Sequence, residues 1–280
     1  MAERSKGITW YVVIAFAITW GAILAISRIP VSDPSDRYSN PLLGLLSLLG
    51  TFGPAIAAIV VRKWITREGF KDAGLRLNLR AGWKYYLCAF FYPLVVIPIA
   101  LGVAAAAGVA ILGLSAQSLA AVIPLIGASI VWTLIYFGEE FGWRGYLQDR
   151  VAPGKPLQAA LLTGLIWGVW HFPFVISGMS LEGKPVGFLI YPIESALISI
   201  FYGWMRTKSR SVWPVCLAHA VGNMVMTNVV AMLLPGVSEL LTWGVFTLVG
   251  YAVVALVLVL SRQVKWREIP AEQAKVHDAG

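Results

Sequence analysis

Long apolar runs separated by short polar segments dominate the chain. These runs lie at about 8–27, 42–61, 85–113, 118–143, 158–177, 187–205, 211–233 and 237–261. A run of about 20 apolar residues is long enough to cross a bilayer as a helix, in which every backbone group is bonded internally. The pattern therefore predicts an all-α, polytopic membrane protein with about eight transmembrane helices.

Composition supports the same interpretation. Of the 280 residues, 58% are hydrophobic and only 13% are charged, which excludes an ordinary soluble domain. The first apolar run meets Arg28 without a small-residue cleavage site, so we expect a retained helix instead of a removed signal peptide. No extramembrane segment is long enough to fold alone. We predict a single membrane domain over residues 1–262, with a motif-bearing core at about 118–233, followed by a short cytoplasmic tail at 263–280.

The positive charge is distributed unevenly between the predicted loops. With the amino terminus inside and eight crossings, every lysine and arginine except Arg28, Arg37 and Lys184 falls on the cytoplasmic side. This bias predicts that both termini are cytoplasmic. The net charge of +8 therefore needs no nucleic-acid partner. The basic segment 62–84 is expected to lie along the interface, where it meets membrane lipids. Short connections without an organelle address favour a prokaryotic plasma membrane.

The sequence YFGEEFGWRG, residues 136–145, places three charged side chains at the end of an apolar run. Unpaired at the bilayer centre, Glu139, Glu140 and Arg144 would together cost on the order of 8 kcal/mol. Glu140 and Arg144 are four residues apart on one helical face, in the order that favours an ion pair. Glu139 lies about 100° around the helix, so it is expected to face another part of the molecule.

Two further helices carry polar residues at a similar depth. In WGVWHFP, Trp167 and His171 are four residues apart, and in HAVGN the same spacing separates His219 and Asn223. Counted at about 1.5 Å per residue from the cytoplasmic helix ends, these groups lie roughly 12 to 21 Å deep. One such residue is often only an interhelical hydrogen bond. The coincidence of depth predicts a functional site, with Trp167 as a supporting residue.

The chemistry of this set suits amide hydrolysis by an activated water. A carboxylate such as Glu139 next to His171 can act as a general base, and His219 with Asn223 can stabilise an oxyanion. No serine or cysteine stands with them at an obvious spacing, which disfavours a covalent nucleophile. Glu139, His171 and His219 would equally suit a zinc ion with a water as fourth ligand. The sequence therefore leaves the cofactor open between none and zinc.

The ordered set EEFGWRG, WGVWHFP and HAVGN resembles the three motifs of the CAAX protease and bacteriocin-processing family, also called the Abi family of intramembrane proteases. The resemblance implies that Glu139 activates the water with His171, whereas Glu140 and Arg144 support the site. It also assigns oxyanion stabilisation to the two polar residues of the last motif, His219 and Asn223.

The resemblance further implies what the site acts on. Trp167 stands where many members carry another aromatic residue, commonly Phe, which leaves the implied mechanism intact. Eukaryotic members remove the last three residues of prenylated CAAX proteins, and bacterial members are linked to peptide maturation or bacteriocin immunity. Some members are assigned as metalloproteases and others as metal-free.

We therefore expect an intramembrane endopeptidase acting on a CAAX-like prenylated or other membrane-associated peptide in a cavity open to the cytoplasm. The basic loops favour an acidic or anionic-lipid-associated substrate. The alternatives are a proton-coupled transporter and a non-catalytic immunity or partner protein. The substrate and the oligomeric state are not specified by the sequence.

Overall fold

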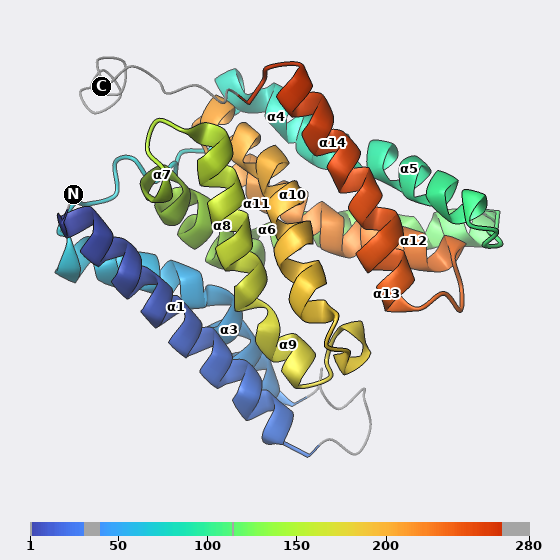
Figure 1. Ribbon diagram of the computed structural model, residues 1–280, viewed down its shortest axis with the longest axis horizontal. Helices are drawn as coiled ribbons and strands as arrows, with labels where there is room; N and C mark the ends of the chain where they lie inside the picture. The colour runs from blue at the N-terminus through green and yellow to red at the C-terminus, as the bar shows by residue number, and fades with distance from the viewer. Residues whose placement is uncertain (1, 31–39, 114, 265–280) are drawn as a thin grey trace.

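The structure, a computed structural model, describes residues 2–30, 40–113 and 115–264, and over these ranges it contains helices and no strands (Figure 1). In chain order the helices are α1 (Ala2–Arg28), α3 (Pro41–Val60), α4 (Leu79–Phe91), α5 (Pro93–Ala106), α6 (Ala116–Gly142), α7 (Gln148–Val151), α8 (Pro156–Trp170), α9 (Phe172–Ile176), α10 (Gly187–Ser209), α11 (Trp213–Val221), α12 (Thr227–Leu233), α13 (Glu239–Leu241) and α14 (Leu248–Leu260). Short turns complete several of these stretches, namely the π-helical η1 (Val61–Ile65), η2 (Trp143–Leu147), η4 (Gly222–Met226) and η5 (Thr242–Thr247) and the 3-10 turn η3 (Leu181–Gly183).

Eight of these helical stretches are long and apolar enough to cross a membrane. They are Glu3–Arg28, Pro41–Ile65, Leu79–Ala106, Ala120–Val151, Pro156–Ile176, Gly187–Ser209, Trp213–Leu233 and Glu239–Leu260. The predicted all-α polytopic fold with about eight transmembrane helices is thus confirmed, and the chain is an integral, multi-pass membrane protein. Beyond residue 264, the predicted tail lies outside the described residues, as does Arg37.

The third span differs from its prediction at both ends. It covers Leu79–Ala106 instead of 85–113. At its start the side-chain amide of Asn78 donates to the Ser209 carbonyl at 2.7 Å, so the basic residues that follow begin a helix anchored at the end of α10. At its end Gly108, with φ of +77°, takes the left-handed conformation that terminates helices. Part of the expected interfacial segment is therefore helical.

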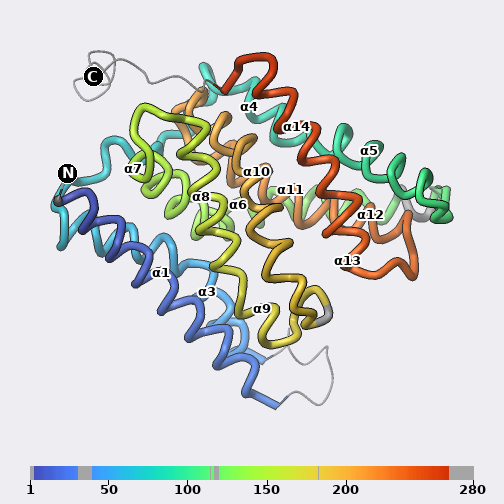
Figure 2. The backbone as a smooth tube through the Cα atoms, viewed as in Figure 1, coloured from blue at the N-terminus to red at the C-terminus, as the bar shows by residue number. Residues whose placement is uncertain are grey.

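The central helices are surrounded by two outer pairs. Figures 1 and 2 show α1 and α3 side by side along one flank and α5 beside α14 along the other, with α8, α10 and α11 between them. The buried core runs through all of these elements. The two motif histidines consequently lie on central helices, away from both flanks.

The close approach of α8 to α10 depends on two glycines. A Cβ at Gly164 would collide with the Ser195 carbonyl oxygen, and one at Gly168 would collide with the Pro192 backbone. Small residues let membrane helices come close enough for such backbone contact. These contacts fix the α8 residues of the WGVWHFP motif against the middle of α10.

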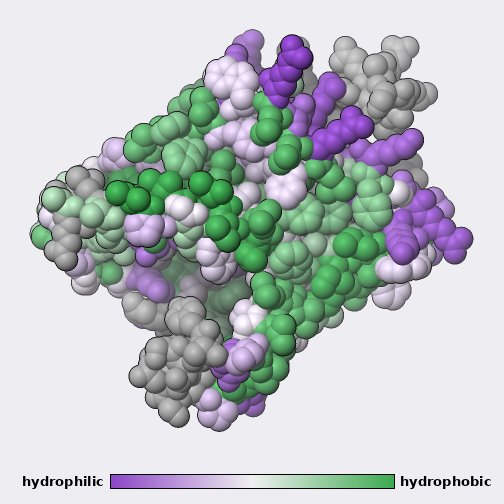
Figure 3. All heavy atoms as spheres, turned by 180° about the vertical axis from the view of Figure 1, so that it is seen from behind, coloured by the Kyte–Doolittle hydropathy of each residue, from purple (hydrophilic) through white to green (hydrophobic). Residues whose placement is uncertain are grey.

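Helix α6 is largely exposed in its first half and buried near its end. Its first half is largely uncovered by protein, with Ile123 70% and Ile130 61% exposed, whereas the segment from Glu139 onward is buried. The helical stretch continues past the predicted end at residue 143 to Val151, because its later polar residues find partners inside the protein. Seen from the back, hydrophobic atoms cover much of the surface, charged ones gather at one end, and the surface is hollowed away from that end (Figure 3).

An ion-pair cluster ties the loop after η1 to the turn η2. Arg62 is fully buried and donates to Asp72 at 2.7 Å and to the Gly145 carbonyl at 2.7 Å. Partial burial would raise the pKa of the Asp72 carboxyl, but the hydrogen bonds and charge of Arg62, together with Arg150, lower it to about 2. Arg206 similarly donates to the Arg144 carbonyl at 3.0 Å. The backbone that carries Arg144 is therefore held from two sides.

Candidate active site

Glu140 and Arg144 form the ion pair that their spacing predicts. Both side chains are fully buried, and Arg144 Nη1 lies 3.0 Å from Glu140 Oε1 and 2.9 Å from Oε2. Arg144 Nη2 donates to the Ser199 hydroxyl on α10 at 2.6 Å. Its guanidinium also lies 4.6 Å from the centre of the Trp167 ring, an arrangement that adds a cation–π attraction. These partners offset the cost of burying both charges.

Glu140 also orients the first residue of the HAVGN motif. His219 Nδ1 lies 2.9 Å from Glu140 Oε1. Because a carboxylate only accepts hydrogen bonds, His219 is the donor, so its Nδ1 carries the hydrogen. The Nε2 atom remains available for another partner. The ring of Tyr136 stacks on His219 with centres 4.0 Å apart and fixes the plane of the imidazole.

Glu139 faces a different neighbour, as its position on the helix predicts. Its Oε2 atom accepts a hydrogen bond from Trp167 Nε1 at 3.0 Å. Its other oxygen, Oε1, makes no hydrogen bond to any residue that the structure describes. The side chain is only 6% exposed. One carboxylate oxygen is thus held in place while the second stays available.

Trp167 connects Glu139 to the first histidine. His171 Nδ1 lies 2.9 Å from the Trp167 backbone oxygen, and because a carbonyl only accepts, Nδ1 carries the hydrogen. The lone pair of His171 therefore resides on Nε2. The Tyr191 ring stacks on the imidazole with centres 4.8 Å apart. Trp167 was expected to be a supporting residue on the strength of its helical face, and it contacts Glu139 and His171 directly.

Asn223 lies in the π-helical turn η4, between α11 and α12. Its side-chain amide donates to the Tyr136 hydroxyl at 2.7 Å. An amide nitrogen carries two hydrogens, so one remains for another acceptor. Tyr136 therefore positions both polar residues of the HAVGN motif, Asn223 by a hydrogen bond and His219 by stacking.

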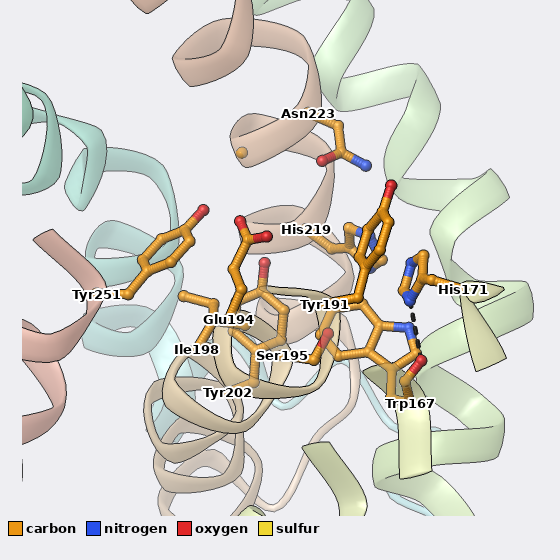
Figure 4. Close-up of a pocket in the computed structure, with 11 residues that line it drawn as sticks. Trp167, His171, Tyr191, Glu194, Ser195, Ile198, Tyr202, His219, Asn223 and Tyr251 are labelled. Carbon is orange, nitrogen blue, oxygen red and sulfur yellow. Dashed lines mark hydrogen bonds between the residues drawn. The ribbon is translucent and has the colours of Figure 1, made fainter. Parts of the chain in front are cut away.

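A cavity of about 120 Å³ brings most of the predicted site residues together (Figure 4). Its walls include Trp167 from α8, His171 directly after that helix, His219 from α11 and Asn223 from η4. Glu139 is not one of its lining residues and reaches the site through its hydrogen bond to Trp167. The remaining walls come largely from α10, with residues Tyr191, Glu194, Ser195, Ile198 and Tyr202, and from Gly222 and Tyr251.

The ligand set proposed for zinc does not assemble in this conformation. Among the described residues, no three His, Cys, Asp or Glu side chains are grouped so that they could hold a metal ion. The nitrogen and oxygen atoms of His171, His219 and Glu139 are instead oriented by Trp167 and Glu140. We therefore assign no step of the chemistry to a metal.

Several residues of the site were not found from the sequence, and four of them contact the motif residues or face the same cavity. Tyr136, Tyr191 and Ser199 contact the motif residues across helix interfaces, and their spacing along the chain gives no sign of it. Glu194 could have been found, since a carboxylate inside the predicted helix 187–205 is the same signal that identified Glu139.

Comparisons with known proteins point to the same region. Residues 120–225 match the family model described as type II CAAX prenyl endopeptidase Rce1-like. The CAAX prenyl protease 2 of Methanococcus maripaludis is 27% identical over 122 residues, which is 41% of this chain. The aligned part spans 44% of the length of that relative. The resemblance to CAAX prenyl endopeptidases is thereby confirmed for the part of the chain that carries the three motifs.

Proposed function

We propose that the protein is an intramembrane endopeptidase that hydrolyses a peptide bond with an activated water. The observation that carries this proposal is that one cavity brings together a proton acceptor, His171, and two hydrogen-bond donors, His219 and Asn223. His171 presents a proton-accepting Nε2 at the cavity and is linked to Glu139 through Trp167, while His219 and Asn223 line the same cavity. The match of the same region to the CAAX prenyl endopeptidase family model and the similarity to a CAAX prenyl protease support it.

In the proposed reaction, Glu139 and His171 bind and deprotonate the water. The free Oε1 of Glu139 and the Nε2 of His171 are both acceptors, so a water between them would direct its own lone pair at a substrate carbonyl. Trp167 keeps the two acceptors at a fixed separation because it bonds to both. The proton taken by the carboxylate is then passed to the leaving amine.

The oxyanion is proposed to lie between His219 and Asn223. For His219 to donate from Nε2 while Nδ1 donates to Glu140, its ring must be protonated. The resulting set of Glu139, Glu140, Arg144 and a protonated His219 has no net charge, which suits a low-dielectric interior. The second hydrogen of the Asn223 amide would complete the oxyanion site.

The proposed substrate is a membrane-associated peptide or the end of a lipidated protein. The match to a prenyl endopeptidase model and the depth of the cavity within the helices support a substrate that reaches the site from the bilayer. We further propose that the protein lies in a prokaryotic plasma membrane, because its connections are short. We also propose that both termini are cytoplasmic, because the positive charges are biased towards that side.

The decisive experiment compares the purified wild type with Glu139→Gln in lipid nanodiscs, on quenched fluorescent peptides with and without a prenylated cysteine. Removing a general base typically lowers the rate by about 10²- to 10⁴-fold. We expect a loss of this size in kcat, because Gln keeps the shape and the hydrogen bond to Trp167 but cannot accept a proton.

Glu3→Gln, which neutralises an exposed carboxylate near the amino terminus, is the matched control and should cleave like the wild type. Repeating the assay with a zinc chelator measures any metal dependence separately. Full activity in Glu139→Gln would rule out the proposed role of this residue. Proton-driven uptake into proteoliposomes without cleavage would favour a transporter instead.

A further inference from the structure

Glu194 is an acidic residue in α10 that the proposed reaction does not use. It lines the same cavity as His219 and Asn223, and Figure 4 shows its carboxylate directed into that space. Among the residues that line this cavity in the described structure, it is the one with a carboxylate. The cavity therefore carries a carboxyl group in addition to the hydrolytic residues.

Glu194 differs from the other acidic residues near the site in its partners within the described ranges. Glu139 bonds to Trp167, and Glu140 bonds to Arg144 and His219, but Glu194 makes no hydrogen bond or ion pair with any described residue. An unpaired carboxylate within a membrane helix is costly, and such residues usually face a cavity or a ligand. We therefore expect the partner of Glu194 to belong to a ligand.

The surroundings of Glu194 favour a cation as that partner. Tyr191, Tyr202 and Tyr251 line the same cavity, and phenol rings present a negative face to positive groups. No lysine or arginine is among the lining residues. A carboxylate among aromatic rings is an arrangement that binds an ammonium or guanidinium group, and its low-dielectric setting strengthens the attraction.

We propose that Glu194 is a specificity residue that binds a lysine or arginine side chain of the substrate peptide, next to the bond that is cut. This inference rests on the proposed function. A cavity of about 120 Å³ is about 6 Å across if it is compact, which is the span of about two extended residues. A peptide whose carbonyl lies on His219 and Asn223 thus places a neighbouring side chain at Glu194.

The test uses one peptide series in which lysine, norleucine or glutamate occupies each position beside the scissile bond in turn. Norleucine resembles lysine in length but lacks the charge. Binding is measured by fluorescence anisotropy and cleavage by release of the quencher, both with the full-length protein in nanodiscs. We expect lysine to be preferred over norleucine by about 10- to 100-fold at one position, the ratio that a hydrogen-bonded charge pair typically provides.

Two variants assign this preference to Glu194. Glu194→Gln should bind and cleave the norleucine peptide like the wild type but lose the preference for lysine, and Glu194→Lys should prefer the glutamate peptide. Ser195→Ala, which changes a neutral lining residue on the same helix, should keep the lysine preference.

The outcomes separate this inference from the proposed function. A wild type that binds lysine and norleucine peptides equally at every position overturns the role of Glu194, whether or not the variants fold. A lysine preference that persists in Glu194→Gln overturns it too. Lysine-selective binding without cleavage of any peptide would retain the cation subsite and refute the endopeptidase.

Discussion

Glu139 and Glu140 are adjacent in the sequence, yet their surroundings differ in kind. Glu140 is fully buried and accepts hydrogen bonds from Arg144 and His219. Glu139 accepts one bond, from Trp167, and keeps an oxygen available beside the cavity. A carboxylate whose acceptor sites are used holds other groups in place, and one with a free oxygen can exchange a proton. The number of partners therefore separates the structural acid from the one proposed to react.

The largest effect is expected from breaking the buried pair. Arg144→Leu leaves Glu140 buried with only His219, and removing one partner of such a pair typically costs about 3 to 5 kcal/mol. We expect the variant to unfold at a much lower denaturant concentration than the wild type in detergent. The double variant Arg144→Leu, Glu140→Leu should recover most of the stability without recovering activity, since His219 loses its orienting carboxylate. A double variant as unstable as the single one would show that packing, not unpaired charge, sets the loss.

A smaller effect is expected where Glu139 meets its one partner. Trp167→Phe removes the indole N–H that holds Glu139 Oε2 but keeps an aromatic ring and the backbone carbonyl that orients His171. A hydrogen bond to a charged group contributes about 1.5 to 3 kcal/mol, so kcat should fall by about 10- to 100-fold. Steady-state kinetics on the reference peptide measure the change.

The matched control for this variant is Trp64→Phe, at an exposed tryptophan far along the chain, which should leave kcat unchanged. An unaltered kcat in Trp167→Phe would mean that the indole N–H is dispensable. Either result sharpens the distinction between Glu139 and Glu140.

The smallest effect is expected at the charged cluster that holds η2. Asp72 has a pKa of about 2 in the folded protein and about 3.9 when unfolded, so its contribution is present above pH 4 and is lost as the pH falls towards 2. Because Asp72 is about half exposed, with 48% of its side chain accessible, solvent screening limits this contribution to about 1 kcal/mol.

Unfolding experiments on the wild type and Asp72→Asn across this pH range measure the effect. The difference in unfolding free energy should be constant above about pH 5, should shrink as the pH falls through 2, and should vanish near pH 1. A difference that is the same at all pH values would show that the hydrogen-bond geometry, and not the charge, secures Arg62.

Much of the fold could be predicted because an apolar run of about 20 residues crosses a bilayer as a helix. Six of the predicted spans match the observed ones within a few residues, and the spacing of Glu140 and Arg144 correctly predicts their pairing. The predicted ends of two spans are wrong where polar residues form hydrogen bonds with other parts of the protein. The fourth span runs on to Val151 and the third begins at Leu79, because hydropathy does not report partners that come from another helix.

From the sequence alone one could predict the membrane fold, different directions for Glu139 and Glu140, and a shared site for His171, His219 and Asn223. These predictions follow from local rules, namely the length of apolar runs and the period of the helix. Which atoms of these side chains remain available depends on tertiary contacts. Hydrogen-bond partners such as Trp167, Tyr136 and Ser199 are set by helix packing, and so is the unpaired position of Glu194, because these contacts join residues that are far apart in the chain.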